Sequence, residues 1–177
     1  DLARAELLLD QANTYLALNL LSEAGAALER CEQLYRSSDQ PYELAQSLLL
    51  HGLVRCRMGD LSGAFTLLSE AERLFAGLLN KLWQNRTALA LAMVEIEAQN
   101  ATAAMARLDR LLAQVNDKSS NVHWDSATLC EARLLRLRLH LQQNEIAAAQ
   151  VQAEQCAVEL QTMPLPQFEL RLEHALG

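Results

Sequence analysis

The sequence predicts an all-α protein, a right-handed α–α superhelix of four helical hairpins plus the start of a fifth. Three observations predict this class. Strong helix formers such as Leu, Ala, Glu, Gln and Arg are common, whereas the chain holds only six glycines and three prolines. Similar turn segments recur along the chain. Apolar residues flank each turn at spacings of three and four, which indicates amphipathic helices.

An alanine closes each recurring turn segment and marks the repeat. Ala24, Ala64 and Ala104 lie 40 residues apart, and Ala149 follows 45 residues later. The five extra residues fall in the polar stretch 116–123, where a loop can absorb them. A small side chain at this position lets the two helices of a hairpin approach closely, so we expect each alanine to be buried between helices.

The residues around these turns indicate where helices begin and end. Asn19, Gly59 and Asn144 suit the left-handed conformation that ends a helix. Longer breaks are expected between the hairpins, at 37–41, near residue 80, at 116–121 and at 163–166. The prolines stand where a helix should stop or restart, at Pro41, Pro164 and Pro166.

The spacing of small and aromatic residues resembles the tetratricopeptide repeat. The second unit shows it most clearly, with Gly52, the pair Gly59-Asp60, Ala64 and Ala71. The other units match at Ala12, Tyr15, Ala24 and Cys31, at Ala92, Ala104 and Leu111, and at Leu137, Ala149 and Cys156. The units are about 40 residues long, where the family has 34. The resemblance implies one repeat domain over 1–177, with repeats at about 5–37, 42–79, 82–115 and 124–162 and a partial fifth at 166–177.

Two phrases carry a narrower resemblance. Residues 82–86 (Leu-Trp-Gln-Asn-Arg) and 165–177 are similar to long repeats that precede bacterial CHAT domains, which are caspase-like. Similar repeats occur in the helical arms of LuxR/MalT-like transcriptional regulators. The pattern also breaks off inside the first helix of a fifth unit, so we expect the chain to be a fragment of a larger protein.

In a tetratricopeptide array the first helix of each hairpin lines a concave groove. The resemblance projects three rows onto this groove: Leu9, Leu49, Leu89 and Leu134; Asn13, Leu53, Met93 and Arg138; Leu16, Cys56, Ile96 and Leu141. From these rows we predict the partner-binding residues Leu9, Asn13, Leu49, Leu53, Leu89, Met93, Ile96, Leu134 and Arg138. The groove would be mostly apolar and suit a peptide segment. Alternatively, tight curvature or further repeats would bury the same residues as core.

Composition and spacing argue against several other functions. The formal net charge of −7 and the lack of a basic stripe argue against nucleic acid as a partner. No apolar run is long enough to span a membrane. Four separated cysteines and four scattered histidines show no metal-ligand spacing, so no metal and no cofactor are expected, and the cysteines suit a cytoplasmic location.

These features predict a protein–protein interaction scaffold without catalytic residues. The leading hypothesis is the sensory or regulatory arm of a larger bacterial CHAT-type protein, binding a polypeptide that can also belong to the same protein. The alternatives are the effector-binding arm of a LuxR/MalT-like regulator and a standalone adaptor.

Overall fold

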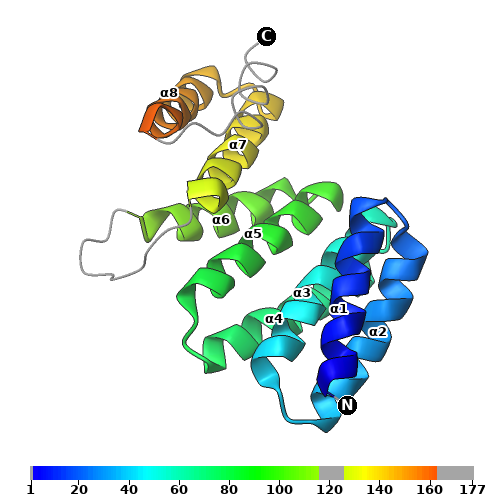
Figure 1. Cartoon of the computed structure of the whole chain (residues 1–177). Helices are drawn as coiled ribbons and strands as arrows, with labels where there is room; N and C mark the ends of the chain where they lie inside the picture. The colour runs from blue at the N-terminus through cyan, green and yellow to red at the C-terminus, as the bar shows by residue number, and fades with distance from the viewer. Residues whose placement is uncertain (1, 116–125, 163–177) are drawn as a thin grey trace. The chain divides into compact units, whose positions relative to one another are not determined.

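The computed structural model describes residues 2–115 and 126–162, which form eight α-helices and contain no strand (Figure 1). The prediction of an all-α fold is therefore confirmed for this part of the chain. The helices are α1 (Leu2–Ala17), α2 (Leu21–Ser37), α3 (Pro41–Arg57), α4 (Leu61–Gly77), α5 (Lys81–Glu97), α6 (Ala101–Ala113), α7 (Ser126–Gln142) and α8 (Ile146–Thr162). The expected start of a fifth hairpin, together with Pro164 and Pro166, lies outside the described residues.

The chain divides into two compact units, which we call the N-terminal unit (Asp1–Ala98) and the C-terminal unit (Gln99–Gly177). The first contains α1 to α5 and the second contains α6 to α8. The boundary falls between the two helices of the third expected hairpin. The pairing of α5 with α6 therefore stays a prediction.

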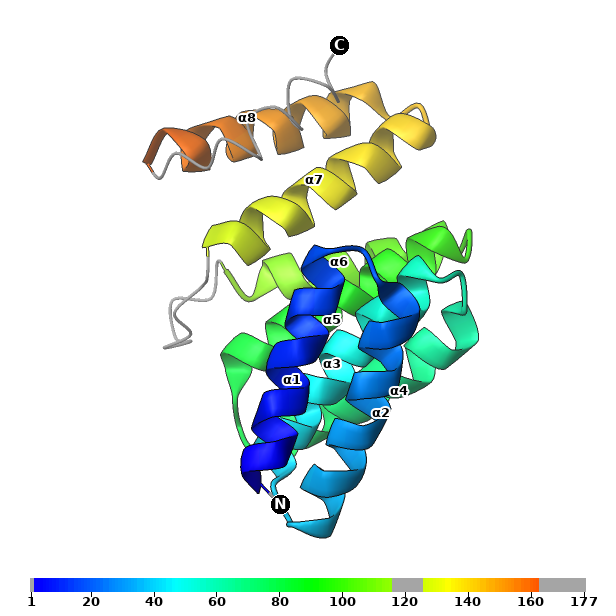
Figure 2. The same cartoon turned by 45° about the vertical axis from the view of Figure 1, so that its right-hand side comes forward.

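In the N-terminal unit each helix packs against the next one in the chain, and α3 also touches α5. Figures 1 and 2 show α1 with α2 and α3 with α4 as antiparallel pairs. The largest side chains of the core are completely or almost completely buried; they include Leu28, Tyr35, Leu48, Leu68 and Phe75. This arrangement is the one expected for stacked helical hairpins.

Every short turn has the same design. Its second residue has a positive φ, between 49° and 83°, at Asn19, Asp39, Gly59, Leu79, Gln99 and Asn144. In the turn at Asn19, the amide of Leu20 donates to the Tyr15 carbonyl and the amide of Asn19 donates to the Leu16 carbonyl. These two bonds define a Schellman motif. The left-handed conformation predicted for Asn19, Gly59 and Asn144 is thus confirmed.

Two of the breaks between hairpins, 38–40 and 78–80, are no longer than the turns within them, so the prediction of longer breaks was wrong at these two places. The break between α6 and α7 is longer, since α6 ends at Ala113 and α7 begins at Ser126. Residues 38–40 and 78–80 form the same three-residue turn as residues 18–20 and 58–60. Each of α2 to α5 is 17 residues long. A 17-residue helix plus a three-residue turn repeats every 20 residues, and two such steps produce the 40-residue unit.

The alanines that mark the repeat are buried, as predicted. Ala24, Ala64 and Ala104 are fully buried, and Ala149 is 2% exposed. The small residue in the first helix serves the same purpose: a Cβ atom on Gly52 would lie 2.6 Å from Cγ of Leu68. The two helices of a hairpin therefore approach more closely than larger side chains would allow.

The C-terminal unit packs α6 on α7 and α7 on α8 (Figure 2). Its core consists of Cys130, Leu134, Leu137, Ala149, Ala153, Cys156 and Leu160. One contact recurs in both units at equivalent positions. The Cys31 thiol lies 3.4 Å from the carbonyl oxygen of Ala5, and the Cys156 thiol lies 3.8 Å from that of Cys130.

Candidate interaction surfaces

The nine predicted partner-binding residues, which we call the first-helix set, differ widely in exposure. Leu49, Leu89, Ile96 and Leu134 are buried, with at most 8% of their surface exposed. Leu9, Leu53 and Met93 are half-buried, and Asn13 and Arg138 are exposed. The set therefore contains packing residues as well as residues that a partner can reach.

Two of the buried members belong to the hydrophobic cores described above. Leu49 packs in the core of the N-terminal unit and Leu134 in the core of the C-terminal unit. Leu9 and Leu53 pack against the N-terminal core with one side and remain partly exposed on the other. Contact between the first-helix set and a partner stays a prediction, and Leu9, Asn13, Leu53 and Met93 are its accessible members in the N-terminal unit.

A polar network that the sequence did not reveal joins α2 to α3, and its central pair, His51 and Glu32, is buried. Nδ1 of His51 lies 2.7 Å from a carboxylate oxygen of Glu32, and Nε of Arg55 donates to Nε2 of His51 at 3.1 Å. Arg55 also donates to Glu29 at 2.8 Å and to Asp60 at 3.4 Å. Because Nε2 of His51 accepts from Arg55, the proton of the neutral ring sits on Nδ1 and is donated to Glu32.

This network has the partners of a general base but lacks access to a substrate. His51 is 2% exposed, and its two ring nitrogens are already engaged by Glu32 and Arg55. A catalytic base needs a reacting group within hydrogen-bond reach. The network therefore acts as a polar link between two hairpins, and Asp60 extends it to the start of α4, where its carboxylate caps the Gly63 amide at 2.9 Å.

The cysteines are thiols in protected positions. Cys31, Cys130 and Cys156 are buried and Cys56 is half-buried. Burial, with a smaller effect of the Glu32 charge, raises the pKa of the Cys31 thiol to about 11. Burial and the charge of Glu97 raise the pKa of Cys56. Since the thiolate is the nucleophile, these two cysteines are poor nucleophiles at neutral pH.

An aromatic cluster anchors α5 to the preceding hairpin. The rings of Phe75 and Trp83 stack with centroids 5.6 Å apart and planes inclined by 16°. Tyr42 meets both rings edge-on, and the Arg86 guanidinium lies 4.8 Å above the Trp83 ring. The contact between Trp83 of α5 and Phe75 of α4 makes the Trp83 ring an anchor between the two hairpins.

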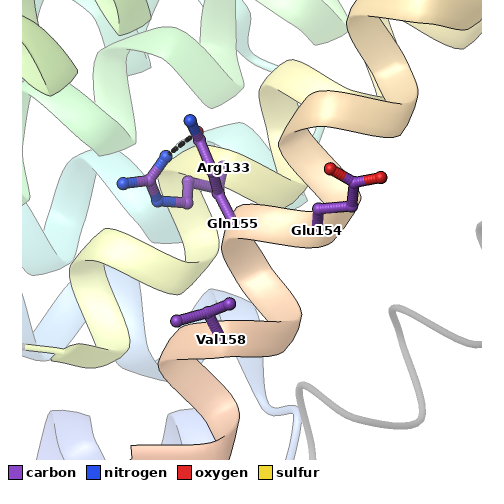
Figure 3. Close-up of a pocket in the computed structure, with 4 residues that line it drawn as sticks. All are labelled: Arg133, Glu154, Gln155 and Val158. Carbon is purple, nitrogen blue, oxygen red and sulfur yellow. Dashed lines mark hydrogen bonds between the residues drawn. The ribbon is translucent and has the colours of Figure 1, made fainter.

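A shallow hollow of about 380 Å³ lies on the C-terminal unit (Figure 3). It is lined by Arg133 of α7 and by Glu154, Gln155 and Val158 of α8. The guanidinium of Arg133 donates to the side-chain oxygen of Gln155, as Figure 3 shows. The sequence contained an indication of this site: Arg133 is charged, whereas the equivalent residues of the first two repeats, Leu8 and Leu48, are apolar and buried.

Two further findings concern metals and membranes. Among residues 2–115 and 126–162, no group of three or more His, Cys, Asp or Glu side chains is placed to hold a metal ion. None of the described helices combines the length and apolar character that a bilayer-spanning helix needs.

Comparison with known proteins adds no relative to this description. No model of a protein family matches the chain, and no curated protein matches it. The fold and the surfaces described above therefore carry the functional argument.

Proposed function

We propose that the chain is a protein-interaction scaffold that binds an apolar polypeptide segment along its first helices. The observation that carries the proposal is the partial exposure of Leu9, Leu53 and Met93 on successive first helices of the N-terminal unit. Half-buried apolar side chains on a repeated element favour the docking of an extended or helical segment. The exposed amide of Asn13 adds a donor and an acceptor for the backbone of that segment.

The negative charge of the N-terminal unit indicates which kind of segment it would bind. Its first 98 residues contain thirteen Asp and Glu but only eight Lys and Arg. An acidic surface attracts basic groups and accelerates their approach. We therefore expect an apolar segment flanked by Lys or Arg. In some tetratricopeptide modules, lysines in the groove bind the C-terminal carboxylate of the partner. The positions of those lysines hold Leu9, Leu49 and Leu89 in this chain, so a C-terminal carboxylate should be a poor ligand.

The proposed biological setting is the sensory or regulatory arm of a larger bacterial CHAT-type, caspase-like protein in the cytoplasm. The similarity of residues 82–86 and 165–177 to repeats that precede CHAT domains supports it. This segment itself would be non-catalytic. A LuxR/MalT-like regulator arm and a standalone adaptor are the alternatives. The coding sequence around this segment discriminates them, since an α/β domain with a Cys and a His favours the first and a helix-turn-helix the second.

Selection from a random peptide library displayed on phage tests the binding proposal without a known partner. The 177-residue chain serves as bait, and the affinities of the selected peptides are measured by fluorescence anisotropy. We expect the double variant Leu9→Asp/Leu53→Asp to weaken binding by about tenfold or more, since two carboxylates would be desolvated under an apolar ligand.

A matched control uses the same substitution on another face of α1. Leu7 is 58% exposed, so Leu7→Asp should leave both the fold and the affinity unchanged. Circular dichroism of all variants shows whether the helices remain formed. Equal binding of the selected peptides to the wild-type chain and to Leu9→Asp/Leu53→Asp would refute the proposed groove.

A further inference from the structure

The outer face of α8 is more apolar than the outer faces of α2 and α4. Val151 and Val158 are 49% and 60% exposed and lie seven residues apart, on the same side of the helix. At the same two repeat positions the exposed residues of α2 and α4 are mostly polar, namely Ala26 and Gln33 of α2 and Thr66 and Arg73 of α4, and those of α6 are the small residues Ala106 and Ala113. Contact with another protein surface would explain why valines occupy these exposed positions.

A further hairpin stacked in the usual way would not cover these valines. In the N-terminal unit α2 meets α3 through Glu29, which binds Arg55, and Glu32, which binds His51. The equivalent residues of α8 are Glu154 and Ala157. Val151 and Val158 occupy the positions of Ala26 and Gln33, which stay exposed on α2 although α3 is packed against it.

We propose that this face of α8 docks on the same face of a second copy of the chain. The arrangement of residues is symmetric about the midpoint between Glu154 and Gln155, because Val151 precedes and Val158 follows this point by the same number of residues. In an antiparallel pair of α8 helices related by a twofold axis at this midpoint, Val151 of each copy lies against Val158 of the other. A self-complementary patch of this kind is what a twofold dimer requires.

The charges of the hollow in Figure 3 fit the same pairing. The axis brings Glu154 of one copy opposite Gln155 of the other. Gln155 holds the Arg133 guanidinium by a hydrogen bond, so Glu154 of each copy would meet Arg133 of the other. Each copy contributes one cation and one anion at the hollow, and the two resulting ion pairs flank the apolar contact.

Sedimentation velocity of the 177-residue chain tests the association directly. We expect a dimer whose population rises with protein concentration. Val151→Asp and Val158→Asp should each raise the dissociation constant by about tenfold or more, because each variant would bury a carboxylate in an apolar contact. Thr66→Asp is the matched control, since Thr66 is exposed at the same position of α4 as Val151 is of α8, and it should leave the dissociation constant unchanged.

Charge exchange tests the ion pairs. Glu154→Arg and Arg133→Glu should each weaken the dimer, because each places like charges opposite one another. The double variant Glu154→Arg/Arg133→Glu reverses both signs and should restore association to near the wild-type level. Circular dichroism distinguishes a loss of association from a loss of folding. If Arg133→Glu impairs folding, the exposed variant Val158→Asp still decides the outcome.

Cysteine cross-linking tests the antiparallel orientation. In a Cys56→Ser background, Val151→Cys chains mixed with Val158→Cys chains should cross-link to each other under mild oxidation. Either variant alone should cross-link much less. The inference does not rest on the proposed function, since it uses no member of the first-helix set. A chain that stays monomeric at high concentration, a dimer insensitive to both Val→Asp variants, or efficient cross-linking of Val151→Cys with itself would overturn it.

Discussion

Single glycines determine how closely paired helices approach in the N-terminal unit. At Gly52 a Cβ atom would lie 2.6 Å from Cγ of Leu68, and Leu68 is fully buried. At Gly25 the nearest atom would be Cγ1 of Val54 at 3.8 Å, an ordinary van der Waals contact. The two positions lie inside helices, so they differ mainly in the space for one methyl group.

The same substitution should therefore have opposite effects at the two glycines. Alanine gains about 1 kcal/mol over glycine in helix propensity. At Gly25 this gain should raise the free energy of unfolding by up to about 1 kcal/mol. At Gly52 overpacking costs roughly 1–3 kcal/mol, which exceeds the gain, so Gly52→Ala should be destabilising. Urea unfolding of both variants measures the difference, and a stabilising Gly52→Ala would contradict the close helix approach.

Leu79 adopts the left-handed backbone conformation, which Gly and Asn adopt more readily than Leu. Its φ is 54°, and 81% of its surface is exposed. Asn19 holds the same turn position without that conflict, because Asn tolerates the left-handed region. We expect Leu79→Asn to raise the free energy of unfolding by about 1 kcal/mol and Asn19→Leu to lower it by a similar amount.

The variant Leu79→Ala separates backbone strain from surface exposure. Alanine removes the exposed leucine side chain but lacks the polar group with which Asn hydrogen-bonds locally in the left-handed region, so its effect should be much smaller than that of Leu79→Asn. Thermal and urea unfolding provide the comparison. Equal stabilisation by Ala and Asn would show that exposure, not backbone strain, is the cost at this position.

At the level of helices and turns, the sequence predicted those turns whose residues have an inherent preference. Asn19, Gly59 and Asn144 favour positive φ, and all three adopt it. Leu79 and Gln99 adopt it as well, although neither residue favours it. Their turns are imposed by the packing of the helices on either side, which a local pattern does not contain. The equal length of the turns within hairpins and of the breaks at 38–40 and 78–80 was missed for the same reason.

The polar link between α2 and α3 gives a prediction at the level of helix pairs. His51→Leu should lower the free energy of unfolding by about 3 kcal/mol, because the buried Glu32 carboxylate loses its donor. Leucine fits the position sterically, since Leu91 occupies the equivalent place in α5 and is 1% exposed. The size of the loss is measured by urea unfolding.

The double variant Glu32→Leu/His51→Leu shows where that loss comes from. Replacing both partners removes the unpaired charge, so the double variant should be more stable than His51→Leu alone. A double variant whose loss equals the sum of the two single losses would show that Glu32 and His51 contribute independently. The helix contact, and not the hydrogen bond between His51 and Glu32, would then be the main link.

For the whole molecule, the sequence predicted the class of fold but not which apolar residues stay accessible. First helices are apolar on more than one side, because they contact several neighbours. In α5, for example, Leu89, Leu91 and Val94 are all buried. A helix of this kind carries little amphipathic signal. Leu49 and Leu53 therefore look alike in the sequence, and only the packing shows that the first is buried and the second half-buried.

The response of stability to pH also belongs to the whole molecule, and it should be stronger on the alkaline side. Burial, with a smaller effect of the Cys31 charge, raises the pKa of the Tyr35 hydroxyl from 10.0 to about 12; that of the Cys31 thiol rises from 9.0 to about 11. Both groups keep their protons longer in the folded chain. Above about pH 9 the unfolded chain binds fewer protons than the folded one, so the free energy of unfolding falls as pH rises.

The acid side should show a smaller loss from the groups with lowered pKa. A hydrogen bond from Arg36 lowers the pKa of Glu70, and one from the Gly63 amide lowers that of Asp60. Their stabilisation is present above the ordinary carboxyl pKa and is lost as pH falls through the lowered value. The Arg36–Glu70 pair is partly exposed to solvent, so its contribution is under about 1 kcal/mol.

The variant Cys31→Ala isolates the alkaline effect. It loses some packing at every pH, so the informative quantity is the change in the free energy of unfolding between about pH 8 and pH 11, not its absolute value. Groups that are common to both chains cancel in this comparison. Over this range the free energy of unfolding should fall by about 2 kcal/mol more for the wild-type chain than for Cys31→Ala. Only the wild-type chain has this thiol, which stays protonated while it is buried and ionises when the chain unfolds. Equal losses in urea unfolding would mean that the Cys31 thiol reaches solvent before the chain unfolds, which its complete burial against the Ala5 carbonyl contradicts.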